Sequence, residues 1–144
     1  MGYFVRKLEE LPVSKVEGAH GGTGVLEVVQ LLGNQEGVGF PGNPDDFESD
    51  VNFLHRLVLP QGTCIGMHKH VNSEEFYYIE KGNAVMIADG NEIHMPPHSV
   101  FMINPGSEHS FLNCETEDVV ALVMEVNLDN KENGERYGEK KGIK

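Results

Sequence analysis

The stretch GTCIGMHKHVNSEEFYYIEKG, residues 62–82, decides the fold. Two glycines bound two runs, at 63–70 and 75–80, whose apolar, β-branched and aromatic residues are typical of β-strands. His68 and His70 stand two positions apart in the first run. Because side chains alternate along a strand, we expect both imidazoles to leave the same face. Two nitrogen donors on one face are half of a metal site.

A carboxylate and a third imidazole follow along the chain. Glu75 opens the second run after a short turn, and if it faces the same pocket, Tyr77 and Ile79 face inward with it. His109 comes much later, after a Pro-Gly turn, and is placed to supply a third imidazole. Mixed nitrogen and oxygen donors suit Fe, Mn, Zn or Ni better than Ca or Mg. We therefore expect one divalent transition-metal ion, bound by His68, His70, Glu75 and His109.

The composition indicates a single all-β domain. The 144 residues are enough for one sizeable core and not for two. Gly (17) and Pro (7) together are frequent enough to indicate many tight turns, and hence many short strands. Lys and Arg number 11 against 23 Asp and Glu, which gives a net charge of -12. This balance disfavours nucleic acid and anionic membranes as partners, because both bind a cationic face.

Turn signals continue from residue 51 onward at intervals of about eight to twelve residues, the rhythm of a sandwich or barrel. Asp89 and Gly90 form the strongest hairpin signal, since both turn positions must tolerate a positive φ. An earlier β-branched run between glycines, at 24–32, also predicts a strand. Beyond these, we expect strands at 52–59, 84–88, 91–95, 100–104, 109–114 and 118–126.

These elements divide the chain into four segments. Residues 4–11 could form a helical turn or an extended arm. The stretch 34–50 is acidic, rich in Gly and Pro and longer than a usual connection, which predicts either a disordered loop or a functional flap. The end of the chain is nearly free of apolar residues, so we expect a solvated tail. The predicted division is 1–33, arm and strand; 34–50, acidic loop; 51–126, β-barrel; and 127–144, polar tail.

The spacing of the candidate ligands resembles that of the cupin family. The residues that match its two motifs are Gly62, His68, His70, Glu75 and Gly82, then Gly106, His109 and Asn113. His98 and Asn104 stand where the family usually has Gly and Pro, at turn positions that bind no metal. The resemblance implies a jelly-roll barrel, or double-stranded β-helix, with a divalent ion held by the three histidines and Glu75. It also implies a homodimer, in which residues 3–32 would pair across the interface; the alternative is that this segment extends the sheet of its own chain.

Other residues are candidates for chemistry beside the metal. Tyr77 would either donate a hydrogen bond to a metal-bound substrate or simply pack against it. Alternation turns either His55 or Arg56 inward. An inward Arg56 would clamp a substrate carboxylate or phosphate, whereas an outward one would pair with surface acids. Counting back from His68, alternation places Cys64 on the inner face. No role is assigned to His20, His94 and His98.

We therefore predict a metal-dependent, dioxygenase-like enzyme acting on a small polar or carboxylate-bearing molecule. Two alternatives stay open: a non-redox isomerase or epimerase acting on a sugar or sugar phosphate, and a non-catalytic barrel that binds a small ligand. The barrel segment has few Lys or Arg residues, which counts mildly against a phosphosugar. The chain has two cysteines and no apolar run near the ~20 residues of a membrane span, which indicates a cytoplasmic protein.

Overall fold

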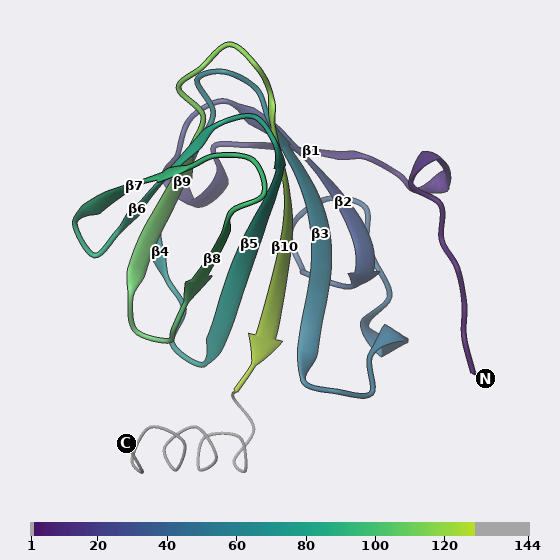
Figure 1. Cartoon of the computed structure of the whole chain (residues 1–144). Helices are drawn as coiled ribbons and strands as arrows, with labels where there is room; N and C mark the ends of the chain where they lie inside the picture. The colour runs from purple at the N-terminus through teal and green to yellow at the C-terminus, as the bar shows by residue number, and fades with distance from the viewer. Residues whose placement is uncertain (1, 129–144) are drawn as a thin grey trace.

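The computed structural model describes residues 2–128, which form ten β-strands in two facing antiparallel sheets (Figure 1). The part of the chain that the structure describes contains no α-helix, only three single 3-10 turns. The strands are β1 (Ser14–Glu17), β2 (Val25–Gly33), β3 (Val51–Leu59), β4 (Cys64–Lys69), β5 (Ser73–Lys81), β6 (Ala84–Ala88), β7 (Asn91–Met95), β8 (Val100–Ile103), β9 (Glu108–Leu112) and β10 (Val119–Asn127).

The connectivity is that of a jelly roll. One sheet has the order β1-β2-β3-β10-β5-β8, and the other has the order β4-β9-β6-β7. Strands that are neighbours in space, such as β3 and β10, are far apart in the sequence, and the chain passes repeatedly from one sheet to the other. The predicted all-β, double-stranded β-helix is therefore confirmed.

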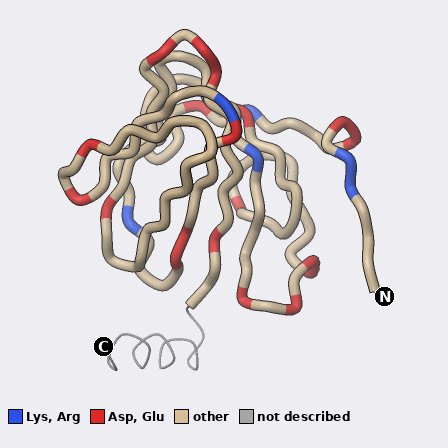
Figure 2. The backbone as a smooth tube through the Cα atoms, in the orientation of Figure 1, with Lys and Arg blue, Asp and Glu red and all other residues tan. Residues whose placement is uncertain are grey.

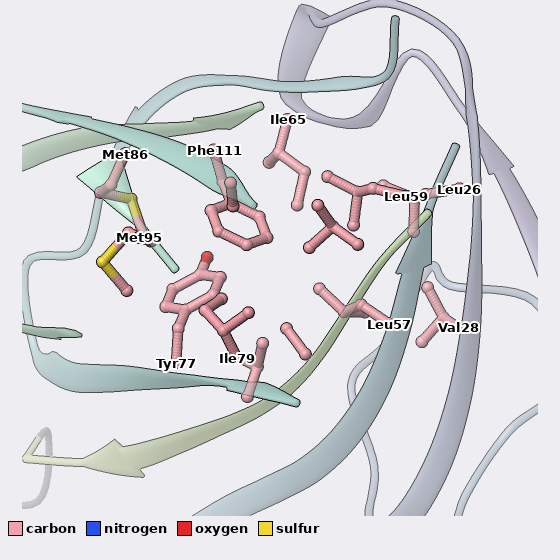
Figure 3. Packing of buried hydrophobic residues seen from close by; sticks show 14 of the residues in the cluster. Leu26, Val28, Leu57, Leu59, Ile65, Tyr77, Ile79, Met86, Met95 and Phe111 are labelled. Carbon is pink, nitrogen blue, oxygen red and sulfur yellow. The ribbon is translucent and has the colours of Figure 1, made fainter. Parts of the chain in front are cut away.

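The core lies between the two sheets because each strand turns alternate apolar residues inward. In β5 the inward positions Glu75, Tyr77 and Ile79 are all buried, as the alternation predicted. Phe111 of β9 and Met86 of β6 are fully buried opposite them. Figure 3 shows Tyr77, Met86 and Phe111 at one end of the apolar cluster and residues of β2 and β3 at the other.

Most strand positions follow the local pattern. The predicted strands 84–88 and 91–95 match β6 and β7, and they are joined by a turn in which Asp89 and Gly90 have φ angles of 48° and 83°. The other predicted strands are confirmed to within two residues at each end. β1 was not predicted, because its four residues carry two charges and show too short an alternation to be recognised.

The N-terminal segment is built into the sheet of its own chain. β2 pairs with β3, and β1 pairs with β2. Residues 14–33 therefore extend the six-stranded sheet of their own chain and do not project from it as an arm. Residues 2–13 run outward from the barrel, as Figure 1 shows, with one 3-10 turn at Leu8–Glu10. Arg6 ties this stretch back through two short contacts with the Asp46 carboxylate, at 2.6 and 2.7 Å.

The acidic stretch 34–50 is held against the barrel by hydrogen bonds. The Gln30 side-chain amide donates to the carbonyl oxygen of Phe40 at 3.0 Å, and the backbone N–H of Gln35 donates back to Gln30 Oε1 at 2.6 Å. Ser14 Oγ accepts from Phe40 N–H at 2.9 Å. The segment therefore packs against the barrel, and residues 34–50 are called the flap below.

Acidic residues lie mainly on loops and strand ends, with few basic residues between them (Figure 2). Among residues 2–128, no helix has the length and apolar character needed to cross a bilayer. Of the predicted tail 127–144, all but the first two residues lie outside the described part of the chain.

Candidate metal centre

A β-bulge in β4 sets the positions of the first two histidines. Ile65 pairs with Phe111 of β9, but His68 pairs with His109, so β4 holds one extra residue between the two pairs. The bulge turns both Ile65 and His68 toward the interior. The prediction that Cys64 faces the interior is therefore wrong: its Sγ lies 3.5 Å from Ser110 Oγ, and Ile65 takes the inner place.

The four predicted ligands come together between the sheets. One ligand atom from each of His68, His70, Glu75 and His109 lies within 4.8 Å of the others. Glu75 Oε1 is 3.3 Å from His70 Nε2 and 3.2 Å from His109 Nε2. Glu75 comes from the six-stranded sheet and His109 from the four-stranded sheet, so only closure of the barrel makes the cluster.

In His68 and His70 the Nδ1 atom, which points away from the cluster, already makes a hydrogen bond. His68 Nδ1–H donates to the carbonyl oxygen of Gly66 at 2.7 Å. His70 Nδ1 lies 3.0 Å from Glu125 Oε2 and hydrogen-bonds to it. In both rings Nε2 is then the nitrogen that would face a cation. His70 Nε2 is buried and makes no hydrogen bond with any residue that the structure describes, so a metal ion would give this buried atom a partner. The donor set thus fits a divalent transition metal.

A cavity of about 230 Å³ opens beside the cluster. His68, His70, Glu75 and Tyr77 form its polar end. Its other walls come from β1, β2, β3, β4 and β10 and from the turn at Ala19 and His20. Residues 35–38 of the flap also line it, and because Glu36 and Gly37 are exposed, this side is its mouth. A ligand in this cavity would reach the donor atoms directly, so the cluster can act on a small molecule as well as brace the barrel.

Comparison with known proteins agrees with this architecture. Residues 55–125 match the model of the family described as the cupin domain, and this region contains all four donor residues. The chain contains a cupin domain.

Relatives of this cupin include proteins with named ligands or reactions. A protein of Thermotoga maritima named oxalate-binding protein is 27% identical over 123 residues, which cover 85% of this chain and 93% of that protein. A crystal structure of a T. maritima protein described as a predicted oxalate decarboxylase aligns with a TM-score of 0.77 and 25% identity, over 87% of this chain and all of that one. A sugar phosphate isomerase from Silicibacter pomeroyi aligns with a TM-score of 0.62 and 17% identity, over 84% and 74% of the two chains. This last likeness shows the fold alone.

Electrostatics make the middle of the cluster favourable for a cation. Burial by itself raises the pKa of the Glu75 carboxyl, but the adjacent His109 and His70 outweigh it and lower that pKa to about 2. The Glu125 hydrogen bond and the neighbouring Glu75 raise the pKa of His70 to about 10. Burial lowers the pKa of His68 to about 4, so this ring stays neutral and able to donate a lone pair. Without a metal ion His70 therefore carries a positive charge, and a divalent ion bound by the cluster would displace a proton from this ring.

Tyr77 lies next to the cluster of this cupin, as the sequence predicted. Its hydroxyl oxygen is 3.4 Å from His109 Nε2, and the side chain is 3% exposed. Burial, together with the Glu75 charge, raises the pKa of the Tyr77 hydroxyl well above its usual value. The hydroxyl therefore keeps its proton and can donate a hydrogen bond to an oxygen atom in the cavity.

Sequence reasoning missed two residues beside the cluster. Glu125 faces inward from β10, directly across from Glu75 of β5, and holds His70. An acidic residue on the inward parity of an otherwise apolar strand was the signal that could have found it. His20 stacks on His68, with ring centroids 3.9 Å apart and planes 8° from parallel. The close approach depends on Gly66, where a Cβ would lie 2.1 Å from the His20 carbonyl oxygen.

The structure shows which of His55 and Arg56 faces the interior. His55 is 3% exposed, lines the cavity and donates from Nε2–H to Gln30 Oε1 at 3.1 Å. Burial lowers its pKa to about 4, which keeps it neutral. Arg56 leaves the opposite face, where its Nε lies 3.8 Å from Glu80 Oε1. It does not line the cavity, so its predicted role as an inward clamp loses its geometric basis.

Proposed function

We propose that this cupin binds one divalent transition-metal ion, Fe, Mn, Zn or Ni, and acts with it as a dioxygenase-like enzyme on a small carboxylate. The proposed ligands are His68, His70, Glu75 and His109. The observation that carries the proposal is their convergence: the four donor atoms lie within 4.8 Å of one another at the wall of a cavity. Four protein donors leave positions for a ligand on a five- or six-coordinate ion.

A bound ion would supply Lewis acidity and, for iron or manganese, redox chemistry. The chain's own side chains would orient the site around it. Gly66 and Glu125 hold the outer nitrogens of two ligand rings, which fixes the direction of their lone pairs. Tyr77 keeps its proton and would donate it in a hydrogen bond to a carboxylate or carbonyl oxygen of the substrate. Residues 35–38 cover the mouth of the cavity and would limit the access of water.

A carboxylate is favoured over a phosphosugar by the cavity lining. Among the described residues around the cavity, none is Lys or Arg, the usual partners of phosphate groups. The relative from T. maritima that is named for oxalate supports a carboxylate as well. A sugar phosphate isomerase function has support only from a shared fold.

Carboxylate binding without catalysis is a second candidate function. It is favoured by the relative whose name records binding of oxalate and no reaction. The same four ligands and the same cavity would serve it, so the two candidates differ only in whether the bound molecule reacts.

Metal analysis tests the ligand set. We expect about one divalent ion per chain after loading and removal of excess metal, and we expect His70→Ala to abolish binding. His94→Ala is the matched control, because His94 is an exposed histidine of β7 outside the cluster. Undiminished metal content in a folded His70→Ala protein would contradict the ligand assignment.

Oxygen consumption separates the two candidates. The Fe(II)-loaded protein should consume oxygen in the presence of a reactive carboxylate, and the His70→Ala protein should not. If carboxylates bind to the metal-loaded protein with no oxygen uptake and no change in the ligand, the binding function replaces the enzymatic one.

We also propose a cytoplasmic homodimer. The two cysteines are free, which agrees with a reducing compartment. The edge strand β8 exposes Val100 and Met102, apolar side chains that a second copy could cover. Light scattering of the purified protein would measure the mass, and a monomer at micromolar concentration would contradict the dimer.

A further inference from the structure

The cavity has a polar end and an apolar end. Beyond the donor residues most of its wall is apolar, with side chains from five strands and the flap that include Val16, Leu26, Val28, Val38 and Leu57. The other polar residues of the lining are His20, Gln35, Glu36 and His55. Figure 3 shows Leu26, Val28 and Leu57 grouped at the end of the core away from Met86 and Met95. Contact with an apolar wall removes a hydrocarbon group from water, which favours binding. The same contact leaves a charged group without a polar partner, which disfavours binding.

The charges around the cavity allow for one negative charge on a ligand. Its described lining carries no Lys or Arg, and its carboxylates are Glu75 beside the donors and Glu36 at the exposed mouth. A divalent ion with three neutral imidazoles and Glu75 would have one net positive charge, and the Glu125 carboxylate beside His70 would offset part of it. The site therefore does not favour a second negative charge on the ligand. A second carboxylate on the ligand would lie unpaired against apolar side chains, which is costly in a buried site.

The size and the metal geometry restrict the ligand further. A volume of about 230 Å³ equals that of seven or eight water molecules, at about 30 Å³ each. Four protein donors leave two positions on a six-coordinate ion, which a chelating head group with two adjacent oxygens would fill. A carboxylate with an oxygen on the next carbon provides such a head group with a single charge.

We infer that the ligand is a 2-oxo or 2-hydroxy monocarboxylic acid with a short apolar side chain, which lies among Leu26, Val28 and Leu57 while the head group faces the donor residues. This inference rests on the proposed function, because it needs a metal ion at the four donors. It narrows the ligand from any small carboxylate to one class, and it predicts that oxalate binds less tightly than a ligand with a branched hydrocarbon chain.

Two probes of equal chain length separate hydrocarbon from charge. 4-Methyl-2-oxopentanoate and 2-oxoglutarate share the head group and the next methylene, and beyond it they differ in an isopropyl group against a carboxymethyl group. With the full chain loaded with Zn²⁺ or Ni²⁺, calorimetry should show 4-methyl-2-oxopentanoate binding at least about tenfold more tightly than 2-oxoglutarate, as expected when the apolar wall discriminates. Oxalate should also bind more weakly than 4-methyl-2-oxopentanoate.

A charge placed at the mouth should change this preference. Val38 is half-buried in the flap and lines the cavity, so Val38→Arg should improve the binding of 2-oxoglutarate by about two- to fivefold. Thr116→Arg is the matched control, since Thr116 is an exposed β-branched residue between β9 and β10, outside the cavity, and the net charge changes equally. The control should leave both affinities unchanged.

The outcomes distinguish this inference from the proposed function. If 2-oxoglutarate or oxalate binds as tightly as 4-methyl-2-oxopentanoate, the inference is wrong and metal-dependent carboxylate binding stands. An unchanged preference in a folded Val38→Arg protein would also contradict the inferred placement of the side chain. If the metal-loaded protein binds none of the three acids, or if no metal binds, the proposed function fails and the inference fails with it.

Discussion

Exchange of Glu125 for Gln tests whether a residue that binds no metal itself controls the metal site. Glu125 Oε2 is 3.0 Å from His70 Nδ1, and the same carboxylate accepts hydrogen bonds from Ser73 Oγ at 2.9 Å and Asn52 Nδ2 at 3.1 Å. Gln keeps the shape of the side chain and removes its charge. It therefore removes the anion that orients His70 and increases the electron density that His70 Nε2 can donate.

The expected loss is large enough to measure directly. Removing the outer partner of a ligand histidine lowers metal affinity by about 10- to 100-fold, which corresponds to about 1.4–2.8 kcal/mol of binding free energy. Competition with a chromogenic chelator for Zn²⁺ or Ni²⁺ would give the affinity of each protein. Circular dichroism would show that the variant is folded.

Glu92→Gln provides the matched control. Glu92 lies exposed on β7 and its exchange changes the net charge by the same amount, but it touches none of the four donors. Its metal affinity should equal that of the unmodified protein. A folded Glu125→Gln protein whose affinity stays within about twofold of the control would refute the argument that Glu125 orients and activates His70.

Three further outcomes are expected. Gly66→Ala should lower the free energy of unfolding by about 1–3 kcal/mol in urea denaturation, because the new Cβ would lie 2.1 Å from the His20 carbonyl oxygen; unchanged stability would contradict the close packing. Tyr77→Phe should retain the metal and weaken carboxylate binding by about fivefold, and equal affinity by calorimetry would leave Tyr77 a packing residue. Arg6 holds the pKa of Asp46 below its usual value, so this pair stabilises the fold above about pH 4 and less as the pH falls through the pKa of the folded state. Arg6→Ala should thus cost about 1 kcal/mol at pH 7 and less at a pH below the lowered pKa of Asp46, and an equal cost at both values would show that the charge is irrelevant.

Local sequence patterns determined the strands, one turn and the inward direction of two residues of the site. Alternation in residues 75–80 placed Glu75 and Tyr77 on the inner face, because a strand's side chains alternate whatever the strand pairs with. The Asp89 and Gly90 turn followed from the rarity of residues that accept a positive φ. The cupin motif then supplied the distant His109, which no local pattern connects with β4.

Side-chain directions that depend on strand pairing could not be predicted from the local sequence pattern. The extra residue of β4 appears only in its pairing with β9, and it reversed the predicted places of Cys64 and Ile65. Alternation required one of His55 and Arg56 to face inward, but the choice depended on which side of β3 the second sheet covers.

The sequence by itself thus determined an all-β chain, the alternation of its strands and, through the motif, the four candidate donors. Tertiary structure alone decided that Glu125 holds His70, that His20 stacks on His68 and that the cavity beyond the donors is apolar. The physical reason is the separation in sequence of the residues that interact. The period of a strand and the φ preference of a turn are properties of a few neighbouring residues. The partners of a buried side chain are set by which strands the closed barrel brings together.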